Sequence, residues 1–401
     1  MELRSFKLVI VGFLVFFSAL YGIQMAIVMP ILSEIMDQYQ IGRGEVSLLT
    51  SGVFLIHGLM IIPGSMIVAR LKIKTAYTVG CFLSGAMVLT VFADSFILLM
   101  ILRVLYSLAF IFMMPASGKM SMLWFSQKER PIVNSLLVTT FTIGIAIGTF
   151  LGAPLSEELG WKVAVSIFGA SVCIGGILWL IIIKPPSEEE KPSNVAGFPN
   201  LIKALRSKVT IILGLADGFA LAQYAVLTTW LPTYYNEVMG MSAVKSGFLV
   251  GLIPLAGAIS ALGGGLIASR YLSRKPLFIL PGLLITAAGF GTFLFNYDVI
   301  IYISIAVLGM CSFLYLPAFL TYPMEIKNST ENDVALVWAG TFAIGSLLAV
   351  VSPTSVGYVT DITGSYLPGF SFWAIIASGL LICGLILPEP AKTTLDLRKL
   401  N

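Results

Sequence analysis

The scarcest feature of this 401-residue sequence is charge. Only 11% of the residues are charged, whereas 58% are hydrophobic and the mean hydropathy is +0.96. A soluble domain carries about a quarter charged residues, because water must solvate its surface. So few charges exclude a water-soluble globular protein of this size, and we expect a lipid bilayer to surround much of the chain.

Histidine and cysteine are also scarce. The chain has one histidine and four cysteines, and the cysteines (Cys81, Cys173, Cys311 and Cys383) all fall in apolar stretches. These numbers argue against a metal centre or a disulfide framework. The lone Gly118-Lys119 lacks the upstream glycine of a phosphate-binding loop, which excludes an ATP-driven pump. We therefore expect no enzyme, no metal, no cofactor and no nucleic-acid partner.

Long apolar runs are abundant instead. A spanning helix needs about 20 apolar residues, and twelve stretches qualify: 8–32, 46–69, 76–94, 96–118, 132–155, 163–183, 209–234, 244–268, 277–295, 299–323, 334–358 and 369–387. The sequence therefore predicts an all-α membrane protein with twelve transmembrane helices.

The basic residues orient these spans. With the N-terminus inside, most of the 24 lysines and arginines fall in cytoplasmic connections, and the outer connections keep only Arg43, Lys162 and Lys245. Because cytoplasmic loops are enriched in lysine and arginine, both termini are predicted to be cytoplasmic. Acidic residues such as Glu237 and Asp361 lie in the predicted outer connections.

A polar interval separates two groups of six spans. Residues 184–208 contain Pro185-Pro186 and an acidic run, and a short amphipathic helix is predicted near 199–206. This composition is typical of a linker. We therefore predict an N-terminal six-helix bundle over 1–183, a cytoplasmic linker over 184–208 and a C-terminal six-helix bundle over 209–401.

The two groups repeat each other at a nearly constant offset. Pro30 matches Pro232, Arg70 matches Arg270, Met114-Pro115-Ala116 matches Leu316-Pro317-Ala318, and Pro154 matches Pro353, at offsets of 199 to 202. Four ordered matches indicate an internal repeat, and paired six-helix halves are typical of secondary transporters with a midplane substrate site. Within the fifth span, Gly144, Gly148 and Gly152 recur every four residues and predict a close helix-packing seam.

The connections resemble those of the major facilitator superfamily. After the second span, GSMIVARLKIK has basic residues at Arg70 and Lys74 but Ala69 at the family's acidic position. The second-half copy GLIASRYLSRK keeps Arg270, and the fourth span carries Arg103 at the family's membrane arginine. The exit of the seventh span also resembles cyanate and nitrate porters. The resemblance covers nearly the whole chain and implies a solute carrier that alternates between inward- and outward-open states.

Ionisable residues inside the membrane are costly and are functional candidates by default. Four such residues are His57, Arg103, Lys119 and Asp217. Arg103 is predicted to bind an anionic substrate, or else to tie its helix to a neighbour. Lys119 and Asp217 lie at similar depth and are predicted to form an inner gate. Asp217 is alternatively a proton-coupling carboxylate, and His57 a proton relay or a structural hydrogen-bond donor.

Softer polar groups complete the predicted site. The cavity helices of the family layout carry Tyr21, Gln24, Gln223, Tyr224 and Tyr315, which can orient a small polar solute in an apolar pocket. Ordinary helix packing is the alternative for each. Arg70 and Arg270 are expected to act in gating.

These features favour a secondary active transporter of a small organic or inorganic anion, coupled to protons. The alternative function is efflux of lipophilic compounds, including drugs, by antiport. We expect a multi-pass protein of the plasma membrane that acts as a monomer.

Overall fold

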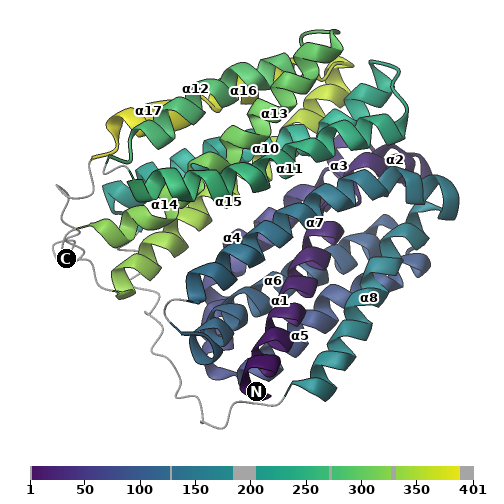
Figure 1. Ribbon diagram of the computed structural model, residues 1–401. Coiled ribbons are helices and arrows are strands. Elements are labelled where there is room, and N and C mark those ends of the chain that lie inside the picture. The colour runs from purple at the N-terminus through teal and green to yellow at the C-terminus, as the bar shows by residue number, and fades with distance from the viewer. Residues whose placement is uncertain (1, 127–128, 184–204, 271–272, 327–330, 389–401) are drawn as a thin grey trace. The chain divides into compact units, whose positions relative to one another are not determined.

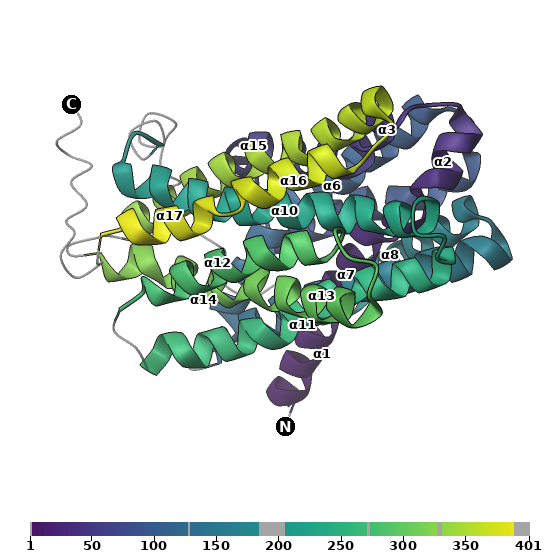
Figure 2. The same ribbon diagram turned by 90° about the horizontal axis from the view of Figure 1, so that it is seen from above.

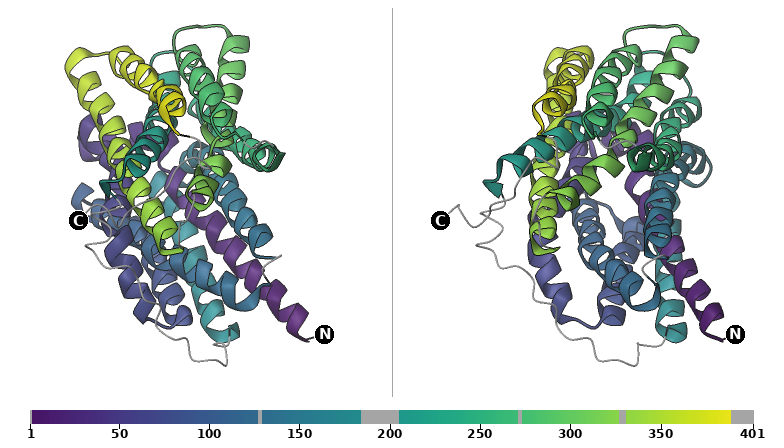
Figure 3. Two further views of the ribbon diagram at one scale, coloured as in Figure 1. Left: turned by 90° about the vertical axis from the view of Figure 1, so that its left-hand side faces the viewer. Right: turned by 60° about the vertical axis from the view of Figure 1, so that its left-hand side comes forward.

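The structure, a computed structural model, describes residues 2–126, 129–183, 205–270, 273–326 and 331–388. Within these ranges every regular element is a helix and none is a β-strand (Figure 1), as both views in Figure 3 also show. A helix satisfies its backbone hydrogen bonds internally, which is what the interior of a bilayer demands of a spanning segment.

Eleven helical segments of the described chain are long and apolar enough to cross a membrane. They coincide with eleven of the twelve predicted spans. The ninth predicted span, residues 277–295, corresponds to α12 (Pro276–Gly291), whose 16 residues are fewer than a full crossing requires. The total of twelve spans and the cytoplasmic termini stay predictions.

The chain forms two compact units, and neither is continuous in sequence. Unit 1 comprises the described parts of Met1–Gln40, Leu59–Val195 and Ser242–Gly251. Unit 2 comprises the described parts of Ile41–Gly58, Ala196–Met241 and Leu252–Asn401. Two helices, α4 (Leu48–Arg70) and α11 (Ala243–Arg270), contribute residues to both units. The predicted bundles and linker stay predictions, and the amphipathic helix near 199–206 falls almost entirely outside the described residues.

Unit 1 is organised around the packing of α1 on α7. Its elements, besides parts of α4 and α11, are α1 (Glu2–Ala26), η1 (Met29–Ile31), α2 (Leu32–Tyr39), α5 (Ile73–Gly85), η2 (Ala86–Phe92), α6 (Phe96–Trp124), α7 (Arg130–Leu159) and α8 (Trp161–Ile182). A Cβ on Gly144 would lie 2.2 Å from the carbonyl oxygen of Ala19, and one on Gly148 would lie 2.5 Å from that of Ile23. The predicted glycine seam is therefore confirmed, because only glycine lets these two backbones approach so closely.

Unit 2 is organised around α10 and α15, which run side by side (Figure 2). Its elements, besides parts of α4 and α11, are α3 (Arg43–Val46), α10 (Lys208–Glu237), α12, α13 (Asp298–Leu314), α14 (Leu316–Thr321), η3 (Tyr322–Glu325), α15 (Glu331–Thr363), α16 (Leu367–Ile376) and α17 (Gly379–Ile386). A Cβ on Gly218 of α10 would lie 3.0 Å from the Cα of Gly345 in α15, so small residues again set a close helix contact.

The prolines of the internal repeat have unequal effects on their helices. α1 ends at Ala26, four residues before Pro30, and α13 gives way to α14 next to Pro317. Proline removes a hydrogen-bond donor and clashes with the carbonyl four residues earlier, which accounts for both breaks. The matched prolines Pro232 and Pro115 lie inside the continuous helices α10 and α6.

Candidate functional site

Arg103 lies in the first half of α6 and is 1% exposed. Its guanidinium donates hydrogen bonds to the carbonyl oxygens of Gln24 (2.8 Å) and Met25 (3.4 Å), in the last turn of α1. Carbonyls at a helix C-terminus lack intrahelical partners and carry partial negative charge, so a cation is favoured there. The guanidinium carbon also lies 4.9 Å from the ring centre of Tyr106, within range of a cation–π interaction.

Gln24 is fully buried in unit 1 and hydrogen-bonded at both ends of its amide. The amide nitrogen donates to the carbonyl oxygen of Phe168 at 3.2 Å, and the amide oxygen accepts from the hydroxyl of Ser84 at 3.2 Å. These contacts tie α1 to α8 and α5. They are the helix-packing role that was the alternative to substrate binding for Gln24.

Tyr21 stacks on Tyr106 with a centroid distance of 4.5 Å, and the Tyr106 hydroxyl donates to the Tyr21 carbonyl oxygen at 2.7 Å. The structure thus brings together Arg103, Gln24 and Tyr21, three of the residues that were predicted to bind substrate. Tyr106 was missed from the sequence. Its position three residues after Arg103 places both on one helix face, and this spacing was the available signal.

Asp217 is the buried acid of α10, with 5% of its surface exposed. Its carboxylate accepts a hydrogen bond from the hydroxyl of Tyr315 at 2.8 Å. Tyr315 stands at the junction of α13 and α14, so this bond joins a continuous helix to a broken one. A Cβ on Gly345 would lie 2.8 Å from Asp217 Oδ2, so this glycine leaves room for the carboxylate.

Gln223 and Tyr224 are adjacent on α10 but have different surroundings. Gln223 donates to the carbonyl oxygen of Ile285 in α12 at 3.2 Å. Tyr224 packs edge-on against Phe313 with centroids 5.4 Å apart, and its buried hydroxyl has no hydrogen-bond partner among the described residues. A buried hydroxyl without a partner is costly. Tyr224 therefore has unused hydrogen-bonding capacity, and the buried amide oxygen of Gln223 likewise has no partner among the described residues.

Lys119 belongs to unit 1 and Asp217 to unit 2. The Lys119 ammonium donates to the carbonyl oxygen of Val68 at 3.2 Å. The predicted gate between Lys119 and Asp217 stays a prediction, since each residue is described here only within its own unit.

The other predicted gating residues have fewer described contacts. His57 is half-buried on the part of α4 that belongs to unit 2, and Arg70 is exposed at the end of that helix. The side chain of Arg270 lies outside the described residues. The roles of all three stay predictions.

Glu325, the last residue of η3, forms a two-pronged ion pair with Arg274, in which the Arg274 Nε donates to Glu325 Oε2 at 2.9 Å. Arg274 belongs to the second loop copy GLIASRYLSRK, so the basic loop motif is anchored within unit 2. A bidentate arginine–carboxylate pair is the geometry that makes such a contact specific.

Comparison with known proteins places the chain in a family. The family model for the Major Facilitator Superfamily matches residues 14–342. A Bacillus subtilis protein named "Probable galactarate/D-glucarate transporter" is 21% identical over 376 residues, covering 82% of this chain and 80% of that protein. The hexuronate transporter of Bacillus subtilis is 24% identical over 337 residues, covering 78% of this chain and 76% of that protein.

Solved structures agree on the fold. A bacterial homolog of the human lysosomal transporter Spinster, crystallised in an inward-facing and unoccupied conformation, superposes with a TM-score of 0.75 at 15% identity. The match covers 96% of this chain and 95% of that one. The resemblance inferred from the loops is thus confirmed, and so is the expectation of a transporter in place of an enzyme. The chain is a multi-pass plasma-membrane protein and belongs to the Major Facilitator Superfamily of transporters.

Proposed function

We propose that this transporter carries a sugar acid, a small carboxylate with several hydroxyl groups, and that protons drive the movement. The observation that carries the proposal is the likeness, over about four-fifths of the chain, to a relative named for galactarate and D-glucarate, together with the similarity to a hexuronate transporter. Each of these solutes combines carboxylate with hydroxyl groups, so a site for them needs a cation and hydrogen-bonding side chains.

Arg103 supplies a cation in unit 1. Its guanidinium holds the end of α1 and is a planar fork of N–H donors. This fork matches the two oxygens of a carboxylate better than an ammonium does. The contacts with α1 and Tyr106 also fix the guanidinium in one orientation, which lowers the entropic cost of ordering it around an anion.

Tyr224 supplies a hydroxyl in unit 2. Because its oxygen is buried without a partner among the described residues, a solute hydroxyl or carboxylate that reached it would satisfy a group that now lacks one. A site that hydrogen-bonds a polar group discriminates strongly against analogues lacking that group. Tyr224 is therefore proposed to favour hydroxylated acids over simple carboxylates.

Asp217 and Tyr315 form the proposed proton carrier. A carboxylate in a membrane helix is costly when charged, and protonation removes that cost. The Tyr315 hydroxyl favours the ionised form by donating to it at 2.8 Å. Binding and release of one proton at Asp217 would change this hydrogen bond, and with it the attachment of the α13–α14 junction to α10.

Uptake into proteoliposomes tests the proposal. Purified protein is reconstituted and supplied with labelled D-glucarate, galactarate or a hexuronate, with galactose as the neutral control. We expect accumulation of at least one acid under an inward proton gradient, its loss with a protonophore, and no accumulation of galactose. Tyr224→Phe is expected to reduce the preference for the sugar acid over succinate, which has two carboxylates and no hydroxyl.

Two results would contradict the proposal in different ways. Uptake of a sugar acid that ignores the proton gradient would remove the coupling and keep the substrate. No uptake of any acid, by protein that is monodisperse and folded, would remove the substrate class and favour the efflux of lipophilic compounds.

A further inference from the structure

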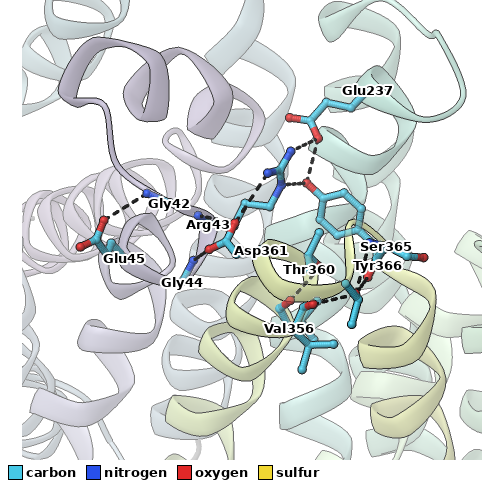
Figure 4. Close-up of polar contacts among 12 residues, drawn as sticks. Gly42, Arg43, Gly44, Glu45, Glu237, Val356, Thr360, Asp361, Ser365 and Tyr366 are labelled. Carbon is cyan, nitrogen blue, oxygen red and sulfur yellow. Dashed lines mark hydrogen bonds and ion pairs between the residues drawn. The ribbon is translucent and has the colours of Figure 1, made fainter.

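Four side chains meet where α3, α10, α15 and α16 approach one another in unit 2 (Figure 4). Arg43 is the first residue of α3, Glu237 the last of α10, Asp361 lies near the end of α15, and Tyr366 directly precedes α16. We call these four residues the Arg43 cluster. All of them fall in or beside connections predicted to face the outside, and the sequence reasoning assigned none of them a role.

Arg43 is held by three partners at once. Its Nη2 lies 2.8 Å from Glu237 Oε2, its Nη1 lies 3.6 Å from Asp361 Oδ1, and its Nε donates to the Tyr366 hydroxyl at 2.7 Å. The same hydroxyl donates to Glu237 at 3.0 Å, which closes the network. Isolated surface ion pairs contribute little, whereas a network with several partners is a better anchor. The three charged side chains are roughly 30% exposed, so water can reach and replace each contact.

Asp361 also binds the backbone of α3. Its two carboxylate oxygens accept hydrogen bonds from the backbone N–H groups of Arg43 (3.1 Å) and Gly44 (2.9 Å). Close packing accompanies this contact, because a Cβ on Gly357 of α15 would lie 2.6 Å from the carbonyl oxygen of Arg43. α3 therefore rests directly on α15 with backbone against backbone.

A second layer of contacts lies below the cluster. The hydroxyl of Ser51 in α4 is 2.9 Å from that of Thr354 in α15, and the buried hydroxyl of Thr229 in α10 donates to that of Thr50 at 3.4 Å. These hydroxyl pairs are uncharged, so they add little to stability by themselves. They form only when α4 packs against α10 and α15, so cysteines at these positions can detect that packing.

The helix attached to this contact continues into the other unit. Residues up to Gly58 of α4 belong to unit 2, and the residues from Leu59 onward belong to unit 1. A rearrangement between the units must therefore bend α4 or detach its first part from α10 and α15. We propose that the Arg43 cluster is a latch that holds α3 and the first part of α4 on unit 2, and that it opens and closes once in each transport cycle.

The latch does not depend on which solute is carried, so its test uses no solute. In a background with the four native cysteines changed to serine, Thr229→Cys is labelled from the outside with a membrane-impermeant maleimide. With Arg43 present, labelling is expected to be slow because Thr229 is 1% exposed. Arg43→Ala is expected to speed labelling about fivefold or more, the change that a loss of about 1 kcal/mol produces.

A second measurement, the rate of disulfide formation, is expected to change in the opposite direction. Ser51→Cys with Thr354→Cys places two thiols where hydroxyls are 2.9 Å apart, and is expected to form a disulfide rapidly under mild oxidation. Arg43→Ala is expected to slow that reaction about fivefold. Lys162→Ala is the matched control, because Lys162 also forms an ion pair in a predicted outer connection, with Asp94, but within unit 1. It is expected to change neither rate.

Tyr366→Phe is the variant to measure if Arg43→Ala does not fold. It removes only the hydroxyl that touches Arg43 and Glu237, and it is expected to shift both rates in the same directions by a smaller factor. If either rate is unchanged in every variant that folds, the latch is overturned. Failure of sugar-acid uptake alone would leave this result standing.

Discussion

The two units each place a buried charge beside a broken helix, but the helices exchange roles. In unit 1, Arg103 lies on the continuous α6 and binds α1, which ends before Pro30. In unit 2, Asp217 lies on the continuous α10 and binds Tyr315, at the α13–α14 break. The repeat matches α1 with α10 and α6 with α13–α14. The interrupted helix is therefore α1, the first span of the N-terminal repeat, in unit 1, and α13–α14, the fourth span of the C-terminal repeat, in unit 2.

This exchange shows that a matched proline permits a break without imposing it. Pro30 and Pro232 occupy equivalent positions, and so do Pro115 and Pro317, yet only one of each pair interrupts its helix. The interrupted helix is in both cases the one that supplies a group to the charge. We infer that the charge and the break work together, with a rigid helix presenting the charge to a deformable one.

The largest effect is expected from Arg103→Ala. Truncation removes the cation and leaves the α1 carbonyls without their donor, and breaking a buried charged contact costs about 3 kcal/mol or more. The initial rate of sugar-acid uptake should fall about a hundredfold. Arg103→Lys keeps the charge but not the planar fork, and should retain about a tenth of the rate. Equal rates in wild type and Arg103→Ala would show that unit 1 needs no charge at this break.

Asp217→Asn should be next in size. The amide can still accept from Tyr315 but cannot carry a proton, so accumulation driven by a proton gradient should fall about tenfold or more. Exchange of labelled for unlabelled solute at equal pH should persist, because exchange needs no net proton movement. Accumulation that survives in Asp217→Asn would assign coupling to another residue and make the charge of unit 2 structural.

A smaller change is expected from Tyr315→Phe, which removes one hydrogen bond and little volume. A hydrogen bond from a neutral donor to a charged acceptor contributes about 1.5 kcal/mol, so gradient-driven uptake should fall about tenfold. Tyr302→Phe is the control, since Tyr302 is an exposed tyrosine on the same helix α13. Comparable losses in both variants would point to a general effect on α13 rather than to the bond with Asp217.

The smallest effect on the transport rate should come from replacing the prolines. These variants test whether the interrupted helix or the continuous one deforms. Pro317→Ala restores a backbone donor at the α13–α14 break and should slow transport about threefold, because a helix gains stability when an interior proline is replaced. Pro232→Ala, inside the continuous α10, should change the rate less than about twofold. Rates measured side by side on protein of equal monodispersity decide this. A larger effect at Pro232 would reverse the assignment of the deformable helix.

Much of this architecture could be predicted because lipid restricts the chain so strongly. Twenty apolar residues in a bilayer have to form a helix, so composition alone located the spans. The same restriction made Arg103 and Asp217 stand out, since a charge at that depth is rare without a reason. Gly144 and Gly148 were recognisable as a packing seam because four-residue spacing aligns them on one helix face.

Partners across space could not be predicted in the same way. The hydrogen bond between Asp217 and the Tyr315 hydroxyl, 98 residues away, had no signal in the sequence, and the pairing of Asp217 with Lys119 stays a prediction. The ion pair of Glu325 with Arg274, which lies 51 residues before it in sequence, likewise had no signal in the sequence. Such contacts depend on which faces two helices turn toward each other. An apolar run with a nearly uniform composition carries little information about that rotation.

The contact between Arg43 and its partners has a consequence for how the protein is made. Asp361 follows Arg43 by 318 residues and Tyr366 follows it by 323. At the usual pace of protein synthesis, those partners emerge from the ribosome on the order of half a minute after α3 has been inserted. During that interval, water, lipid headgroups or the insertion machinery must solvate the Arg43 guanidinium and the N–H groups at the start of α3. Assembly of unit 2 is thus a late event in biogenesis, completed only when the chain is nearly finished.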